Sequence, residues 1–533
     1  MVKDMHMRRE TGDNTVVQVS TPSSSNASGA QEELTVVDKA ELHLKSESEK
    51  NLSGEDDTIW VDFEEGDIRN PVNFSRSKKW SITYLCCFST VMGSCVASAY
   101  NMGFESMIAD LNCTEFQATI GLALFALGFG VVPLVTASFS EEFGRQPLYY
   151  SAVIGIELMY IMIAEAKNIQ TVLIARFLQG SFASTWATMV GGSIADIWPS
   201  RERGLPMSLF SFAAVGGVGI GPVCAGWIEM NPRLQWRWIQ WIEMIVTALY
   251  LILLPVIMTE TRSSIILIRI ARKMRKETGN NRYRARVELE RTKLSTLIYI
   301  SCTRPIQLLL TEPVVASFSV NSLLWIGFMW GILYCMIESI GLVFKTVHGF
   351  NIGQVGTVFV TFIISAFLGV CTNLYQDHLY RKNFATRGPE ARLYLACLAA
   401  ILAPSGMFIY AWSTFSHVPW IALAIGITVF LYATFIIYSA VFTYLADCYG
   451  PFASSALAGQ SLLRNIAAMA FPLFTQQMFT RLTFKWANTL FGCIACLMMP
   501  IPFILFFYGP RIRSKSRFSR MVMMAEQSIG GKA

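Results

Sequence analysis

Charged residues are scarce in this chain. Only 15% of its 533 residues are Asp, Glu, Lys or Arg, whereas 53% are hydrophobic. Because soluble globular proteins carry about 25% charged residues, this composition excludes an ordinary soluble protein. The net charge of +6 is modest and does not indicate a nucleic-acid partner.

Motifs for catalysis and metal binding are also missing. The sequence contains no G-x-x-x-x-G-K-[ST] loop, which excludes a P-loop ATPase, and no G-x-S-x-G segment. The twelve cysteines fall mostly in apolar stretches, and the one C-x-x-C pair, Cys493 with Cys496, lies inside such a stretch. The histidines are scattered over tails and loops: His6, His43, His348, His378 and His417. We therefore expect no enzyme, no metal site and no cofactor.

Hydrophobic stretches long enough to cross a bilayer are abundant instead. A transmembrane helix needs about 20 predominantly apolar residues, and twelve such stretches can be recognised. They begin near Ser81, Ala118, Leu148, Gln170, Leu205, Trp238, Val314, Val355, Ala391, Val418, Ala453 and Ala487. The sequence therefore predicts an all-α membrane protein with twelve transmembrane helices.

Positive charge is distributed unevenly between the loops. From Arg262 to Arg304, twelve Lys or Arg residues stand against three acids, whereas the loop from Asn101 to Phe116 contains no Lys or Arg. The positive-inside rule therefore places both termini and the middle loop in the cytoplasm. We expect a multi-pass protein of the plasma membrane, with the vacuolar membrane as the alternative.

The chain divides into five segments. Residues 1–75 are polar and lack apolar periodicity, which predicts a disordered cytoplasmic tail, so the first span is expected to act as the insertion signal. Residues 76–260 form the first six-helix bundle, 261–311 a basic middle loop, 312–508 the second bundle and 509–533 a cytoplasmic tail. In the middle loop, Ile265 to Lys276 predicts an amphipathic helix on the inner membrane face.

A faint internal repeat accompanies this division. Its matching positions are Glu141 and Arg145 with Asp377 and Arg381, and Asp196 with Asp447. Each set follows the second or fourth span of its half. Duplicated halves around a central site are a known plan for transporters, so the repeat favours a solute carrier with gating contacts at these positions.

Two arginines lie inside apolar stretches. Arg176 is followed by Gln179, and Arg464 lies in the eleventh stretch. Arginine in a helix centre costs at least about 2.5 kcal/mol, so each should face the bundle interior and pair with an acid or a substrate. The alternative is that Arg176 extends its head group to a membrane interface.

Acidic residues occur in the same setting. Glu157 and Glu243 lie within the third and sixth stretches, and a carboxyl group in a low dielectric can exchange protons near neutral pH. Each is a candidate proton carrier, or else a structural partner of a nearby polar group. Glu338, after the seventh stretch, and Asp447, after the tenth, are expected near the aqueous edges with gating or hydrogen-bonding roles.

Small residues mark two further candidate gating elements. Gly217, Gly221 and Gly226, with Pro222, remove side-chain bulk from the fifth stretch, which lets helices approach closely. Gly144, between Glu141 and Arg145, permits a tight turn after the second stretch. An acid there could face a helix N-terminus and latch the inner side; the alternative is a plain loop with a surface ion pair.

Two features concern the outer face and the cavity. Asn112 belongs to the only N-x-[ST] sequon in a predicted external loop, so it is a candidate glycosylation site. Among the many aromatic residues, Tyr250, Trp325 and Trp330 are candidates to line a cavity for flat organic molecules, although packing alone would explain most of them.

Several of these segments resemble the major facilitator superfamily, specifically the twelve-span drug:proton antiporters of fungi. The resemblance runs from about Arg69 to Phe518. The segments that carry it are Ser140 to Pro147, Arg176 to Gly180, Ala195 to Pro199, Gly217 to Gly226, Trp236 to Trp238, Thr303 to Pro305, Glu312-Pro313, Pro389 to Leu393 and Gly509 to Arg513. It implies two six-helix bundles, alternating access and export of small organic compounds against proton entry. It also implies that Arg176 belongs to the proton or substrate relay.

The sequence departs from the family pattern at three positions. Gln146 replaces a usual basic residue, Gln460 a common Asn, and Glu243 a usual uncharged residue. Our interpretation is an exporter of a drug-like compound or secondary metabolite, working as a monomer in the bilayer on a small molecule and protons. The alternatives are an uptake carrier for polyamines or a small organic acid, and a non-transporting receptor.

Overall fold

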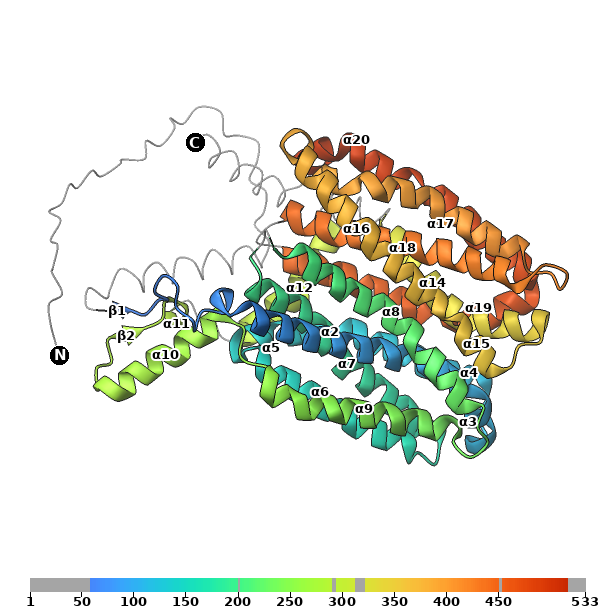
Figure 1. Cartoon of the computed structure of the whole chain (residues 1–533), viewed down its shortest axis with the longest axis horizontal. Helices are drawn as coiled ribbons and strands as arrows, with labels where there is room; N and C mark the ends of the chain where they lie inside the picture. The colour runs from blue at the N-terminus through green and yellow to red at the C-terminus, as the bar shows by residue number, and fades with distance from the viewer. Residues whose placement is uncertain (1–57, 200–201, 290–293, 312–321, 450–452, 516–533) are drawn as a thin grey trace.

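The computed structural model describes residues 58–199, 202–289, 294–311, 322–449 and 453–515. Helices dominate, and in Figure 1 those of the first half (blue to green) lie below those of the second half (yellow to red), with their axes roughly parallel. The middle loop and β1 project from one end of this bundle. We call that end the middle-loop end and the opposite end, which carries α3 and α15, the far end.

Within the described residues, the N-half contributes six crossings. Their elements are α2 (Arg76–Ala99) with η2 (Tyr100–Gly103) and α3 (Phe104–Leu111), α4 (Glu115–Val131) with α5 (Pro133–Phe143), α6 (Arg145–Ala164), α7 (Ile169–Ile197), α8 (Gly204–Glu229) and α9 (Gln235–Ile257). Polar side chains begin several of them. The Ser75 hydroxyl accepts from the Lys78 N–H at the start of α2, and Thr114 with Gln117 forms a capping box on α4.

The C-half repeats this plan. Its elements are α14 (Ser322–His348), α15 (Ile352–Val358) with α16 (Val360–Arg387), η3 (Gly388–Leu393) with α17 (Tyr394–Trp412), α18 (Trp420–Tyr449), α19 (Ala453–Met498) and α20 (Pro500–Lys515). The helical path of α19 breaks at Thr483, where φ is 65°. The chain turns there, so the first part of α19 is the eleventh crossing, and the remainder with α20 is the twelfth.

The described residues contain ten apolar segments of spanning length. The last of them, Ala456–Ser514, covers the two crossings that meet at Thr483, and α7 adds a crossing of 29 residues. The prediction of twelve transmembrane helices is therefore confirmed. The starts agree within five residues of the expected positions, except that Val314 lies outside the described residues.

The two halves meet through a few helices. α8 packs on α2 of its own half and on α15 and α16 of the other, and α4 packs on α19. Glycine permits this double contact: a Cβ on Gly217 or Gly221 would lie 2.8 or 2.7 Å from backbone oxygens of α2, and one on Gly219 would lie 2.7 Å from the Phe359 oxygen. The glycine-rich segment is thus the seam between the halves.

The middle loop forms a small unit outside the bundle. It contains α10 (Ser263–Thr278), β2 (Tyr283–Arg284) and α11 (Arg286–Leu289), followed by α12 (Leu294–Thr311). β1 (Ile59–Trp60) pairs in parallel with β2, and η1 (Pro71–Asn73) precedes α2. Residues 58–75 therefore carry structure where a disordered tail was expected.

The amphipathic helix was expected on the membrane face, but its apolar side is covered by protein. Ile265, Ile268 and Ala271 of α10 are buried against Val61 and Ala285. The helix itself was predicted correctly, and its partner was not. Apolar residues at helical spacing show that one side of a helix needs cover, but they do not distinguish lipid from a neighbouring segment of the same chain.

Candidate functional site

A cavity of about 460 Å³ lies between the two halves. Its walls come from α2, α4, α5, α7, α8 and the first residue of α6 on one side and from α14, α18 and α19 on the other. The lining includes Arg145, Gly192 and Ala195 at the middle-loop end of the N-half. The cavity therefore extends from the middle of the bundle toward the middle-loop end.

Contacts between the halves close the far end. The Asn101 side chain donates to the Ile337 carbonyl oxygen at 2.6 Å, and the Trp227 indole donates to the Thr357 hydroxyl at 3.2 Å. A Cβ on Gly226 would lie 2.8 Å from the Ile352 oxygen, so glycine is needed for this approach. The space between the halves is therefore closed at the far end and hollow toward the middle-loop end.

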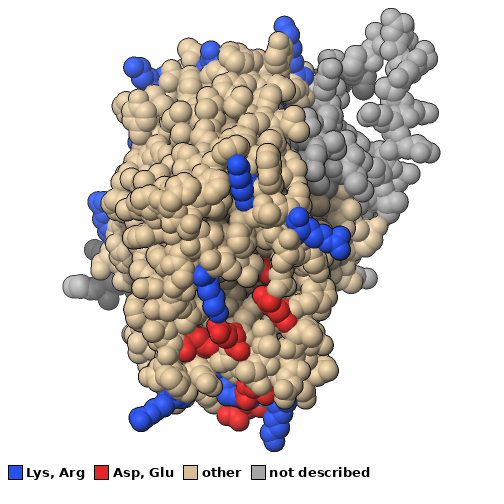
Figure 2. Space-filling model, turned by 90° about the vertical axis from the view of Figure 1, so that its right-hand side faces the viewer, with Lys and Arg blue, Asp and Glu red and all other residues tan. Residues whose placement is uncertain are grey.

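Figure 2 views the molecule from the far end. Acidic side chains gather over the lower part of this face, which belongs to the N-half. One of the acids bridges the halves, because Glu105 of α3 pairs with Lys345 of α14 at 2.8 Å. Asn112, the candidate glycosylation site, is exposed at the end of α3, and its glycan remains a prediction.

Arg176 is fully buried inside the N-half. Its side chain is 0% exposed, and Nη1 donates to the Gln179 side-chain oxygen at 2.8 Å and to the Val96 carbonyl oxygen at 3.0 Å. The guanidinium group lies between two rings, 4.2 Å from the centre of Tyr100 and 4.5 Å from that of Phe125. The alternative in which Arg176 extends to an interface is therefore wrong.

Arg464 occupies a different position on α19. It lines the cavity and is 8% exposed, with its guanidinium carbon 4.5 Å from the Trp330 ring centre and 5.3 Å from that of Tyr438. Tyr334, also in the lining, lies close enough to interact electrostatically with both Arg464 and Arg176. Of the three aromatic candidates, Trp330 lines the cavity, Tyr250 is buried in the N-half core, and the Trp325 side chain lies outside the described residues.

Some of the candidate acids lie where the sequence predicts them, and one does not. Glu243 on α9 interacts electrostatically with Arg176, and Glu157 on α6 has a buried oxygen without a hydrogen-bond partner. Neither belongs to the described lining of the cavity. Glu338 was expected after the seventh span, and that is wrong: it lies within α14, is 8% exposed, and accepts from the Thr119 hydroxyl of α4 at 3.4 Å. The described helix that holds Glu338 runs from Ser322 to His348, so the carboxyl group lies inside the span and not after it.

An ion-pair cluster lies at the middle-loop end of the N-half, where the sequence predicts a latch; its gating role stays a prediction. Gly144 has φ 92°, which suits glycine, and Arg145 Nε lies 2.6 Å from the Asp196 carboxylate. Glu260, after α9, completes the cluster: its carboxylate accepts from the backbone N–H groups of Arg145 and Gln146 at 3.1 and 3.4 Å. The side chain of Glu141 lies outside the described residues.

Glu260 was missed by the sequence reasoning. The acid expected at a helix N-terminus was Glu141, yet Glu260 faces the start of α6, where free N–H groups and the helix dipole favour negative charge. A Cβ on Gly144 would lie 2.3 Å from the Glu260 carboxylate, so the glycine also makes room for it. The only local signal is an acid directly after a span.

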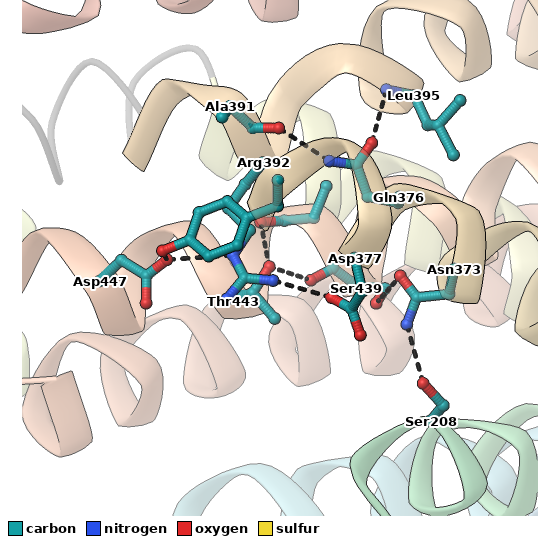
Figure 3. Close-up of polar contacts among 12 residues, drawn as sticks. Ser208, Asn373, Gln376, Asp377, Ala391, Arg392, Leu395, Ser439, Thr443 and Asp447 are labelled. Carbon is teal, nitrogen blue, oxygen red and sulfur yellow. Dashed lines mark hydrogen bonds and ion pairs between the residues drawn. The ribbon is translucent and has the colours of Figure 1, made fainter. Parts of the chain in front are cut away.

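The latch of the C-half differs from the expected repeat. Asp377 and Arg381 lie inside α16 rather than in a loop. Arg392, not Arg381, occupies the position between acids: it pairs with Asp377 and Asp447, each at 3.0 Å (Figure 3). Its guanidinium also lies 3.4 Å from the Tyr380 ring centre. The matched spacing of acid and arginine was therefore misleading for Arg381.

A hydrogen bond beside this cluster joins the halves at the middle-loop end. The Asn373 side chain of α16 donates to the Ser208 hydroxyl of α8 at 3.1 Å (Figure 3). A Cβ on Gly204, at the start of α8, would lie 2.8 Å from the Asp377 carboxylate. The charged cluster of the C-half therefore lies beside a contact between the two halves.

The family model described as the Major Facilitator Superfamily matches residues 86–451, well over half of the chain. The chain belongs to the Major Facilitator Superfamily. Members of this superfamily are membrane transporters and not enzymes, so the sequence-based expectations of class and fold are confirmed. In the described part of the chain no group of three His, Cys, Asp or Glu side chains is arranged to hold a metal ion.

Curated relatives within the superfamily are fungal. The chain is 32% identical over 473 residues to the MFS-type efflux pump MFS2 of Trichophyton rubrum, covering 87% of this chain and 78% of the relative. It is 31% identical to the multidrug transporter mdrA of Aspergillus fumigatus (88% and 77% covered) and to the efflux pump FUB11 of Gibberella moniliformis (89% and 80%). Among solved structures, the proton:xylose symporter XylE aligns with TM-score 0.57 at 15% identity, covering 82% of this chain and 96% of XylE, which supports the fold.

Proposed function

We propose that this transporter exports a small organic compound, drug-like or a secondary metabolite, in exchange for protons across the plasma membrane. The observation that carries the proposal is the cavity between the halves, which extends toward the middle-loop end beside two buried arginines. The basic middle loop assigns that end to the cytoplasm, together with both termini. The names of its fungal relatives, efflux pump and multidrug transporter, support the outward direction.

Glu243 and Arg176 are the basis of the proposed proton coupling. Both are removed from the described cavity lining, and a negative charge on Glu243 would attract the Arg176 guanidinium, which has no ion pair among the described residues. Protonation of Glu243 removes that attraction, so the position of α7 relative to α9 depends on the proton. Arg176 contacts Val96 of α2 and the Phe125 ring of α4, whose helices border the cavity, and this links the proton to substrate binding. Glu157 is the second candidate proton carrier.

Gating involves both ends of the bundle. Glu338 and Thr119 join the halves where the far end is closed, whereas the two arginine latches border the middle-loop end. In alternating access, the contacts that close the far end break while the two arginine latches at the middle-loop end move closer to one another. The glycine seam along α8 is the surface over which the halves rock.

Inside-out membrane vesicles provide the test. Their outer surface is the cytoplasmic face, which an N-terminal epitope verifies, and their lumen is made acidic. An exporter that exchanges substrate for protons accumulates substrate in the lumen while protons leave, and a protonophore abolishes the accumulation. The Arg176→Ala variant, at an equal membrane level, accumulates none. Loss of substrate from the lumen along with protons would instead identify an uptake carrier and refute the proposal.

A further inference from the structure

The described lining of the cavity contains only two ionisable groups that carry charge, and both are arginines. They are Arg464 and Arg145; no Asp, Glu, Lys or His belongs to the described lining. Arg145 is paired with Asp196 at 2.6 Å. Arg464 is therefore the charge that a bound substrate meets.

Arg464 has no carboxylate partner among the described residues. Its one hydrogen bond is a long contact from Nη2 to the Ser461 hydroxyl at 3.3 Å, and Nε has no partner although it is buried. Two other enclosed arginines are neutralised: Arg392 by two acids, and Arg513 by Glu390 through two hydrogen bonds of 2.8 and 2.9 Å. Arg176 also has no ion pair among the described residues, but it does not belong to the described cavity lining. A buried cation without a counterion is unfavourable, and Arg464 is the one that a solute in the cavity reaches.

A second unused donor lies one helical turn from it. Gln460 and Arg464 are four residues apart on α19, so their side chains share a face of the helix. Gln460 lines the cavity, and its amide Nε2 is buried without a hydrogen-bond partner. Two hydrogen-bond donors and one positive charge are thus free at the same part of the wall.

Aromatic side chains surround these donors. Trp330 and Tyr438 lie against the Arg464 guanidinium, and Phe442 and Phe125 belong to the same lining. An arginine over a ring face keeps its in-plane N–H groups available, and its fork matches the two oxygens of a carboxylate. Flat aromatic surfaces favour a flat apolar body.

The geometry points to a planar aromatic monoanion, an organic acid in its carboxylate form, as the substrate class, with Arg464 and Gln460 binding the carboxylate. This inference rests on the proposed function, since it names the cargo of the same cavity. It separates the chain from a polyamine carrier, because a polycation would require acids that the described lining does not contain. A negative potential inside the cell also favours outward movement of an anion.

Three compounds of nearly equal shape test the charge. We would measure the binding of 2-naphthoate, 2-naphthamide and 2-naphthylmethylammonium to the full chain in nanodiscs of uncharged phosphatidylcholine, by quenching of tryptophan fluorescence, with empty nanodiscs as blank. We expect naphthoate to bind at least about tenfold more tightly than naphthamide, the amount that one charged hydrogen bond supplies. Tighter binding of the ammonium compound, equal binding of acid and amide, or no binding of naphthoate at millimolar concentration would overturn the inference.

Variants locate the preference. In Arg464→Gln the acid and the amide should bind equally, whereas Arg464→Lys should keep part of the preference and Gln460→Leu should weaken naphthoate alone by a few fold. Lys485→Gln is the matched control, because Lys485 lies on α19 with its amine 3.7 Å from the Trp412 ring centre but outside the described lining. A preference that survives in Arg464→Gln protein with an unchanged melting temperature would refute the assignment.

Transport separates this inference from the proposed function. In the acidic-lumen vesicles, proton-driven accumulation of naphthoate but not of the ammonium compound supports both. If naphthamide or the ammonium compound accumulates in preference to naphthoate, proton-driven export is supported and the proposed anion site is refuted. If naphthoate binds in an Arg464-dependent way but shows no proton-driven movement, the anion site is supported and the proposed proton exchange is refuted.

Discussion

Arg176 in the N-half and Arg464 in the C-half both lie inside apolar helices, but their surroundings differ. Arg176 is enclosed between Tyr100 and Phe125, and its Nη1 is held by two acceptors inside the N-half. Arg464 lies on the cavity wall with a single long hydrogen bond. The enclosed arginine can sense the arrangement of helices, whereas the arginine on the wall can bind a solute.

The halves also differ at their latches. In the N-half Arg145 pairs with Asp196 at 2.6 Å, and Glu260 accepts from backbone N–H groups at the start of α6. Two arginines of the middle loop lie farther out, Arg262 at 3.7 Å from Asp196 and Arg269 at 3.8 Å from Glu260. In the C-half Arg392 lies between Asp377 and Asp447, and a separate pair, Glu390 with Arg513, ties η3 to α20. A duplicated plan thus keeps its charges at one end while the partners have diverged.

The comparison of arginines predicts the largest effect. Arg176→Ala should lower transport of every substrate by about 100-fold or more. The change removes the buried guanidinium together with its two hydrogen bonds, each worth about 1.5–3 kcal/mol. Efflux normalised to the amount of protein in the membrane measures it. The comparison fails when Arg464→Gln, rather than Arg176→Ala, abolishes transport of uncharged substrates as well.

The difference between Arg392 and Arg381 predicts the next effect. Arg392→Gln leaves two acids without their cation and should lower transport by about tenfold, because losing a charged hydrogen bond costs about 1.5–3 kcal/mol. Arg381→Gln, a change of the same chemistry on α16, should stay within about twofold. Initial efflux rates of the two variants decide it; equal losses would restore the repeat expected from the sequence.

The N-half latch predicts a change in stability. Glu260→Ala removes the acceptor of four backbone N–H groups, those of Arg145, Gln146, Thr261 and Arg262. We expect the free energy of unfolding to fall by about 1–3 kcal/mol, seen as a lower melting temperature in detergent. Glu260→Gln keeps a side-chain oxygen and should lose less. A melting temperature that is unchanged in Glu260→Ala would show that water replaces the carboxylate.

The smallest effect concerns the middle-loop unit, for which the described C-half shows no counterpart. Hydrogen bonds from Arg275 hold the pKa of the Glu288 carboxyl below its usual value. Because this pKa is depressed in the folded state, the contact stabilises α10 and α11 above the unfolded pKa of about 4.3 and is lost as pH falls through the folded pKa. The protection of residues 263–289 against hydrogen exchange, relative to the intrinsic exchange rate at each pH, should fall at acidic pH, and Glu288→Gln should remove that pH dependence.

Local patterns in the sequence predicted much of this architecture. The starts of the crossings and a place for Arg464 in the bundle interior were expected from apolar runs and motifs. Arg145 and Asp196 were both expected to be gating residues, but their pairing with each other was not predicted. Arg392 and Glu260 were missed. Their partners lie 15 to 115 residues away in the chain, and neither hydropathy nor spacing reports such distances.

The number of crossings and the basic loop follow from the sequence alone, because transfer of a helix into hydrocarbon depends on the residues of that helix. The tertiary structure determines which charged side chains are paired and which remain available to a solute. Pairing depends on separations of a few ångströms between side chains of different helices, and only the packing of the helices sets these separations. Arg176 and Arg464 look alike as residues in apolar helices; one is sealed by its neighbours and the other faces the cavity.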